Sequence, residues 1–206
     1  MQTILKYFPE LTQEQQQQFR VMLQLYPEWN SKINVISRKD IENLEINHIL
    51  HSLALVKFVK FVDGTTIMDL GTGGGFPGLP LAVYFPNVQF HLIDRIAKKL
   101  RVAQEIATQA GLKNVTFQHG DVLEVKGTFD FVVSRAVMPL PDMVKLVRRF
   151  ISKDSMNAIP NGLLCLKGGE LQQELHPYKK DVLVDEISSY FTEDFFKTKK
   201  IVYLPF

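Results

Sequence analysis

The fold is decided by residues 65–78, which read TTIMDLGTGGGFPG. The first six residues have the apolar character of a short buried strand, and a cluster of glycines follows at once. Glycine lets the backbone turn tightly and lets a ligand approach where a Cβ atom would clash. A helix is expected next, with apolar positions at Leu79, Leu81, Ala82 and Val83. A strand, a glycine-rich turn and a helix in this order are typical of a nucleotide-binding α/β fold.

Strands and helices continue to alternate along the rest of the chain. We expect further strands at 88–94, 115–118, 129–134 and 162–166, and helices that include 96–110 and 143–151. Such alternation predicts a parallel, doubly wound sheet. The tail breaks the pattern with two strands on a short link, an antiparallel hairpin at the sheet edge, at 182–190 and 201–204. The prediction is a Rossmann-like α/β domain over 64–206 with a mostly parallel seven-stranded sheet.

Residues 1–63 are expected to form a helical N-terminal extension. Thr12 and Gln15 have the spacing of a capping box at a helix start. One apolar stripe follows at helical spacing, made by Phe19, Met22, Leu23, Tyr26 and Trp29. A second helix is predicted over 41–61.

The composition sets limits without identifying a partner. Apolar residues make up 46% and charged residues 22% of the 206, which is ordinary for a soluble globular protein. No apolar run approaches the roughly 18 residues of a membrane span, and no signal pattern opens the sequence, so we expect a cytoplasmic protein. The single cysteine, Cys165, excludes an internal disulfide and is expected to be buried. We expect a monomer without a bound metal. The net charge of +2 is too small to establish a nucleic-acid partner.

Two cofactor classes use a glycine turn of this kind. Gly73, Gly75 and Gly78 satisfy the dinucleotide pattern GxGxxG, and Asp94 closes the second strand about 20 residues later, where a carboxylate can hold a ribose. Three features favour S-adenosylmethionine over NAD. Asp69 precedes the glycines, where an acid suits the methionine end of the cofactor. Two prolines tighten the helix start at Pro77 and Pro80, where a pyrophosphate would need free N–H groups. A polar segment that could bind an adenine edge follows the third strand at 120–122.

Several motifs resemble the bacterial 16S ribosomal RNA guanine-N7 methyltransferases, the RsmG or GidB family. They are GTGGGFPGLPLA at 71–82, SRAV at 134–137, LKGG at 166–169, WNSKINVIS at 29–37 and NHILHSL at 47–53. The resemblance covers nearly the whole chain in order. It implies a class I methyltransferase fold and methyl transfer from S-adenosylmethionine to N7 of a guanine in the decoding-region loop of 16S rRNA, alone or within the small ribosomal subunit.

The resemblance also implies roles for individual residues. Arg135 would face the methionine carboxylate or the active site, and Lys167 would lie on the substrate side; these two are the candidate catalytic residues. The candidate cofactor-binding residues are Asp69, Gly71, Gly73, Phe76, Asp94, Asp121, Val122, Leu123 and Arg135. The family often has Arg, a small residue and Glu at 121–123, so Asp121 is expected to take over the adenine-edge contact. It also often has Arg-His-x-x-Asp-Ser where this chain has NHILHS at 47–52.

The expected chemistry fits this set of residues. Guanine N7 carries a free lone pair and needs no general base, so alignment and base extrusion remain the tasks of the protein. Candidate RNA contacts, each with a structural alternative, are Trp29, Arg38, Lys39, His48, Arg135, Lys167, Arg148 and Arg149. Three other functions stay open: a methyltransferase for a small molecule or protein, an NAD(P)-linked oxidoreductase, and a non-catalytic RNA-binding module.

Overall fold

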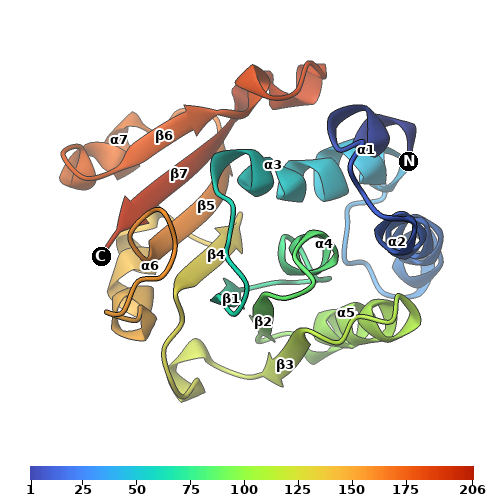
Figure 1. Ribbon diagram of the computed structural model, residues 1–206, viewed down its shortest axis with the longest axis horizontal. Coiled ribbons are helices and arrows are strands. Elements are labelled where there is room, and N and C mark those ends of the chain that lie inside the picture. The colour runs from blue at the N-terminus through green and yellow to red at the C-terminus, as the bar shows by residue number, and fades with distance from the viewer.

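One seven-stranded sheet organises the chain, and the computed structural model describes residues 1–206 (Figure 1). The strand order is β3-β2-β1-β4-β5-β7-β6, and β7 runs antiparallel to both of its neighbours. The strands are β1 Thr66–Leu70, β2 Gln89–Asp94, β3 Val115–His119, β4 Phe131–Arg135, β5 Gly162–Gly168, β6 Leu183–Glu186 and β7 Lys199–Pro205. The order reverses beside β1, between β1 and β4, which is the place where ligand crevices form in open α/β sheets.

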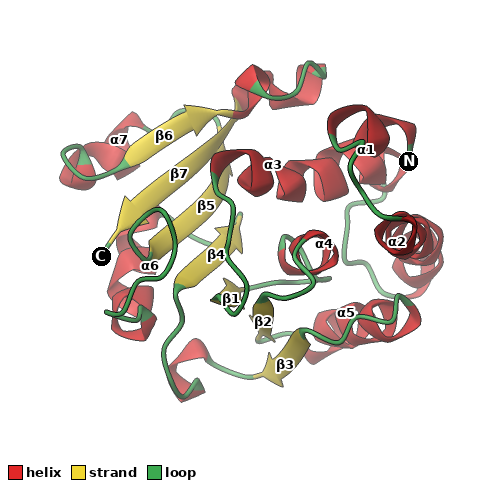
Figure 2. Ribbon diagram, in the orientation of Figure 1, coloured by secondary structure: helices red, strands yellow, loops and turns green.

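The helices lie on the two faces of this sheet (Figure 2). The N-terminal extension contains α1 Gln2–Tyr7, α2 Gln13–Lys32 and α3 His51–Phe58. The remaining helices are α4 Gly78–Tyr84, α5 Ala97–Gln109, α6 Leu140–Val147 and α7 Gln172–Leu175. Short 3₁₀ helices occupy Ile41–Asn43, Val122–Glu124, Arg148–Phe150, His176–Tyr178, Ile187–Ser189 and Asp194–Thr198. The connection from β3 to β4 therefore contains only one 3₁₀ turn, where a strictly alternating chain would have a full helix.

The C-terminal strands form the predicted antiparallel pair at the sheet edge, with β6 outermost and β7 between β5 and β6. The first strand is shorter than the expected 182–190, and the link between the two strands contains two 3₁₀ helices. Burial explains this order. Residues 201–204 are all buried, whereas Leu183 and Val184 of β6 are exposed, so the more apolar strand takes the interior position.

The N-terminal extension begins as predicted and then departs from a regular helix. The Thr12 side chain accepts from the Gln15 backbone N–H, and the Gln15 side chain accepts from the Thr12 N–H, which confirms the capping box. The expected helix over 41–61 starts as a 3₁₀ turn, continues as a π-helix over Leu44–Leu50, and becomes α-helical only at His51. π-helical turns are rare and often occur at functional sites.

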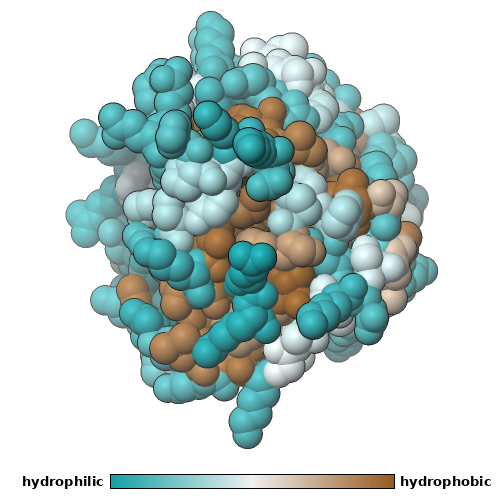
Figure 3. All heavy atoms as spheres, turned by 90° about the vertical axis from the view of Figure 1, so that its left-hand side faces the viewer, coloured by the Kyte–Doolittle hydropathy of each residue, from teal (hydrophilic) through white to brown (hydrophobic).

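Two apolar clusters fill the space on either side of the sheet. The larger, of 39 buried residues, joins the N-terminal extension to α4, α5 and the sheet, so it crosses the boundary between 1–63 and 64–206. The smaller, of 17 residues, lies under α6 and includes Cys165, whose burial raises the pKa of its thiol to about 12. The face beside α6 and α7 is hydrophilic over much of its outline, and hydrophobic atoms are visible between the polar side chains, mainly in its centre and lower part (Figure 3). None of the helices combines the length and the apolar character that crossing a membrane requires.

Candidate functional site

The glycine loop between β1 and α4 is fixed from below by Asp69. This carboxylate is fully buried, and its Oδ2 accepts hydrogen bonds from the Thr72 hydroxyl at 2.6 Å and from the Gly78 N–H at 2.8 Å. Burial raises the pKa of Asp69 to about 7, against the opposing effect of these two hydrogen bonds. The other oxygen, Oδ1, has no partner in the protein. Asp69 therefore fixes the conformation of the loop through Oδ2, whereas its Oδ1 remains without a hydrogen-bond partner.

Two positions in the loop require glycine for different reasons. Gly71 has φ of +67°, and a Cβ atom there would lie 2.6 Å from the Val137 side chain. Gly78 has an ordinary φ, but a Cβ atom would lie 2.7 Å from Asp69 Oδ2. Because glycine has no Cβ atom, the loop can both turn at Gly71 and pack closely against Val137 and Asp69.

The N-terminal extension holds the upper side of the same loop. The Tyr26 hydroxyl donates to the Gly74 carbonyl at 2.6 Å, and its ring stacks on Phe76 with centroids 4.6 Å apart. The Val35 side chain lies against Gly74. The sequence assigned Tyr26 only to an apolar stripe, and nothing in its spacing separated a loop contact from a core position.

Two adjoining hollows, of about 350 and 240 Å³, lie along the loop at the carboxyl ends of β1, β2 and β4. Both are lined by Gly71 and Asp94. Asp94 is oriented by two backbone groups, because its Oδ2 accepts from the Gly73 N–H and its Oδ1 from the Ile96 N–H, each at 2.7 Å. We call the two hollows together the loop cavity.

Most of the predicted cofactor-binding residues line the loop cavity: Gly71, Gly73, Phe76, Asp94, Val122 and Arg135. Three predicted residues do not line it. Asp69 lies beneath the loop, as described above. Asp121 caps the turn at 122–124 and pairs with Arg95, and Leu123 is 55% exposed. Their contact with a cofactor stays a prediction.

Arg135, at the end of β4, is held by a chain of polar groups from the N-terminal extension. Its Nη2 donates to His48 Nδ1 at 2.9 Å, and His48 Nε2 lies 2.6 Å from Asp40 Oδ2. An arginine can only donate, so His48 Nδ1 accepts and its Nε2–H donates to the carboxylate. Burial and the nearby Arg135 lower the pKa of His48 to about 4, which leaves the ring neutral. The Arg135 guanidinium also lies over the Phe76 ring, 4.9 Å from its centroid.

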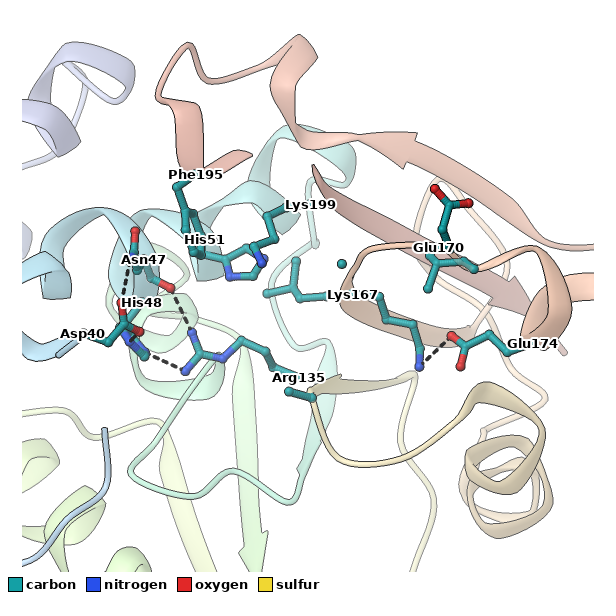
Figure 4. A pocket seen from close by; sticks show the side chains of 14 residues that line it. Asp40, Asn47, His48, His51, Arg135, Lys167, Glu170, Glu174, Phe195 and Lys199 are labelled. Atoms are coloured by element: carbon teal, nitrogen blue, oxygen red, sulfur yellow. Dashed lines mark hydrogen bonds and ion pairs between the residues drawn. The ribbon is translucent and has the colours of Figure 1, made fainter. Parts of the chain in front are cut away.

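A second and larger cavity of about 560 Å³ opens on the other side of Arg135, which lines both spaces (Figure 4). We call it the β5 cavity. Lys167, from β5, pairs with Glu174 at 2.8 Å and donates to the Met138 carbonyl at 3.1 Å. The cavity also receives His51, Glu170, Phe195 and Lys199. The structure therefore brings Arg135 and Lys167 to one cavity, as the sequence predicted. Sequence reasoning missed Glu170, Phe195 and Lys199, because contacts between elements far apart in the chain leave no local signal.

The remaining candidate RNA contacts do not line either cavity. Trp29 is half-buried and packs against the larger apolar cluster, as expected for a member of the apolar stripe. Arg148 and Arg149 are exposed, and Arg149 donates to the Leu123 carbonyl at 3.1 Å. Arg38 and Lys39 are exposed beside Asp40. A contact with RNA stays a prediction for each of these residues.

Comparison with known proteins gives one consistent result. The sequence model of GidB, described as rRNA small subunit methyltransferase G, matches residues 15–202. A protein of Bacteroides fragilis named ribosomal RNA small subunit methyltransferase G is 58% identical over 99% of both chains. Proteins of the same name are 59% identical over 98% of both chains in Bacteroides thetaiotaomicron, and 51% identical over 100% of this chain and 98% of the relative in Flavobacterium johnsoniae.

Solved structures with the same fold are more distant in sequence. A precorrin-6y C5,15-methyltransferase from Geobacter metallireducens has a TM-score of 0.56 at 12% identity, covering 84% of this chain and 92% of its own. A ribosomal protein L11 methylase from Lactobacillus delbrueckii has a TM-score of 0.55 at 17% identity, covering 76% and 77%. At these identities the likeness establishes the fold alone, and it confirms the predicted class I methyltransferase architecture.

Proposed function

Because this chain belongs to the GidB family, the rRNA small subunit methyltransferase G proteins, we propose that it transfers a methyl group from S-adenosylmethionine to N7 of a guanine in the decoding-region loop of 16S rRNA. The observation that carries the proposal is the pair of cavities that meet at Arg135, one along the glycine loop and one open toward β5. Methyl transfer needs two such spaces, one for the donor and one for the acceptor, joined at a single point.

The loop cavity suits S-adenosylmethionine. Asp94 closes β2, where its carboxylate is positioned for ribose hydroxyls, and Ile93, Val122 and Leu146 offer apolar surface for the adenine. Arg135, which lines the cavity, fits the carboxylate of the methionine portion, and Asp69 beneath the loop would favour its ammonium through its negative charge. When bound, the cofactor supplies a methyl group already activated by its sulfonium.

The β5 cavity suits an acceptor that needs no base. Guanine N7 attacks with its own lone pair, so the protein has to align the base and keep water out, and such positioning is worth roughly 7–11 kcal/mol. The base becomes positive as the methyl arrives, and free cations beside it would oppose the reaction. Arg135 is bound to neutral His48, and Lys167 is paired with Glu174, so neither side chain needs the guanine ring as a partner. The third cation of the cavity, Lys199, lies over the Phe195 ring at 4.7 Å and would have to stay clear of N7.

A labelling experiment tests the proposal directly. Tritiated S-adenosylmethionine is incubated with the protein and with naked 16S rRNA, 30S particles or free guanine nucleotides. We expect label in one of the two RNA substrates, and a primer-extension stop at one guanine after borohydride and aniline treatment. Label in a protein or small molecule, with none in RNA, would instead support the alternative of a different acceptor class.

A further inference from the structure

His51 is a buried histidine in the wall of the β5 cavity whose outer nitrogen has no partner. It is the first residue of α3 and only 5% exposed. The ring makes edge-to-face contacts with Phe195 and Phe196, with centroids 5.4 and 6.1 Å away. Figure 4 shows it beside Lys199 and Arg135, facing the open space. Its Nε2 makes no hydrogen bond within the protein, which is rare for a buried polar atom and calls for a ligand or water.

The protonation state of this ring follows from its surroundings. The Asn47 carbonyl, four residues earlier, favours a ring N–H directed toward it and so raises the pKa of His51. Because Nε2 has no partner, we place this hydrogen on Nδ1. Burial and the cations Arg135 and Lys199 hold the pKa of His51 well below its usual range. The ring is therefore neutral, and Nε2 presents a lone pair to the cavity. Whatever binds there must offer a hydrogen-bond donor.

The charges around the cavity indicate what kind of ligand carries that donor. Three cationic side chains are balanced by three carboxylates: Arg135, Lys167 and Lys199 against Asp40, Glu170 and Glu174. A balanced set of this kind favours a neutral polar ligand over a phosphate, which would require a surplus of positive charge. The volume of about 560 Å³ lies within the usual range of ligand pockets. Enzymes that modify a base commonly read its Watson–Crick edge inside such a pocket.

We propose that the β5 cavity takes the acceptor guanine and that His51 Nε2 accepts a hydrogen bond from its Watson–Crick edge, from N1–H or from the exocyclic 2-amino group. This inference rests on the proposed function and adds a specificity-determining residue to it. Adenine has no hydrogen on N1 and no 2-amino group, so it would leave the buried acceptor unpaired. A site built to hydrogen-bond its substrate rejects an analogue that lacks the group.

The test compares three acceptors and three proteins. The modified nucleotide, once mapped, is supplied as guanosine, inosine or 1-methylguanosine in ligated 16S rRNA; inosine lacks the 2-amino group and 1-methylguanosine lacks N1–H. The proteins are the wild type, His51→Phe, which removes the acceptor, and His51→Asp, which keeps one. We expect the wild type to lose roughly tenfold in kcat/KM with one analogue. His51→Phe should lose about as much with guanosine and nothing further with that analogue, whereas His51→Asp should still discriminate.

Two controls make the outcome decisive. Affinity for S-adenosylhomocysteine should stay within about twofold in both variants, because His51 does not line the loop cavity. If His51→Phe fails to fold, the wild type alone decides, since equal rates with all three acceptors overturn the inference. A wild type that methylates guanosine without discriminating refutes only the role of His51. A wild type that methylates no guanine refutes the proposed function, and this inference with it.

Discussion

Two alanine substitutions at glycines with the same backbone conformation should separate cofactor binding from folding. Gly73 and Gly64 have φ of +57° and +85°, and a Cβ atom at either position would meet nothing within 4 Å. Alanine in the left-handed region is disfavoured by about 1–2 kcal/mol at each site. For a chain of this size that predicts a fall in Tm of roughly 2–8 °C for both variants. Only Gly73 lines the loop cavity.

The two variants should then diverge in ligand binding. In Gly73→Ala the new methyl group would occupy space that we assign to S-adenosylmethionine. Forcing a methyl group into filled space costs about 1–3 kcal/mol, which corresponds to a roughly 5- to 150-fold weaker Kd. Gly64→Ala should bind as tightly as the wild type, because the turn before β1 lies away from the cavity.

Titration calorimetry with S-adenosylhomocysteine, alongside thermal unfolding followed by circular dichroism, measures both quantities. The reasoning is refuted if the two variants are equally destabilised and also bind the ligand equally well. That result would mean that no cofactor lies against the glycine loop. A Gly73→Ala protein that loses far more stability than Gly64→Ala would show instead that the methyl group meets other atoms of the protein at position 73.

Three further expectations concern Arg135, His48 and the RNA. Arg135→Lys should lower kcat by tenfold or more without a matching loss of stability, because an ammonium cannot reproduce the planar guanidinium over Phe76. Steady-state kinetics with a denaturation control measures both quantities, and an unchanged kcat would show that Arg135 is not part of the site. The pKa of His48 is lowered in the folded state, so the unfolded state binds an extra proton between about pH 4 and 6.5. The contribution of neutral His48 to stability is therefore present above that window and is lost as the pH falls through it. Urea unfolding at pH 5 and 7 should show a larger loss of unfolding free energy in the wild type than in His48→Gln, and equal losses would contradict a neutral buried ring. Binding to small subunits should weaken steeply with salt: the logarithm of the binding constant should fall by about 0.7–0.9 per phosphate contact for each tenfold rise in salt concentration. S-adenosylhomocysteine binding should stay unchanged in the same filter-binding series. RNA binding that does not depend on salt would exclude an interface made with phosphates.

The sequence by itself determined the central architecture. Residues 65–78 predicted the strand, the turn and the helix, because their signals are local: an apolar run, glycines and a helix start. The parallel strands and the site at their carboxyl ends followed from the alternation, since that edge is where crossover loops converge. Arg135 and Lys167 could be placed at the site for the same reason, as each ends a buried strand. The resemblance of GTGGGFPGLPLA to the family motif then predicted the cofactor and the activity.

Only the tertiary structure decided what completes the site. Asp40 and His48 come from the N-terminal extension, and Phe195 and Lys199 come from the link before β7 and from its first residue. No spacing in the sequence connects these segments, because the contacts that join them are made by packing between distant elements. The same is true of the order of β6 and β7, which depends on competition for burial against β5. Local patterns fix which elements form, whereas the ligand-facing role of a residue such as His51 depends on which hydrogen-bond partners the folded chain leaves it without.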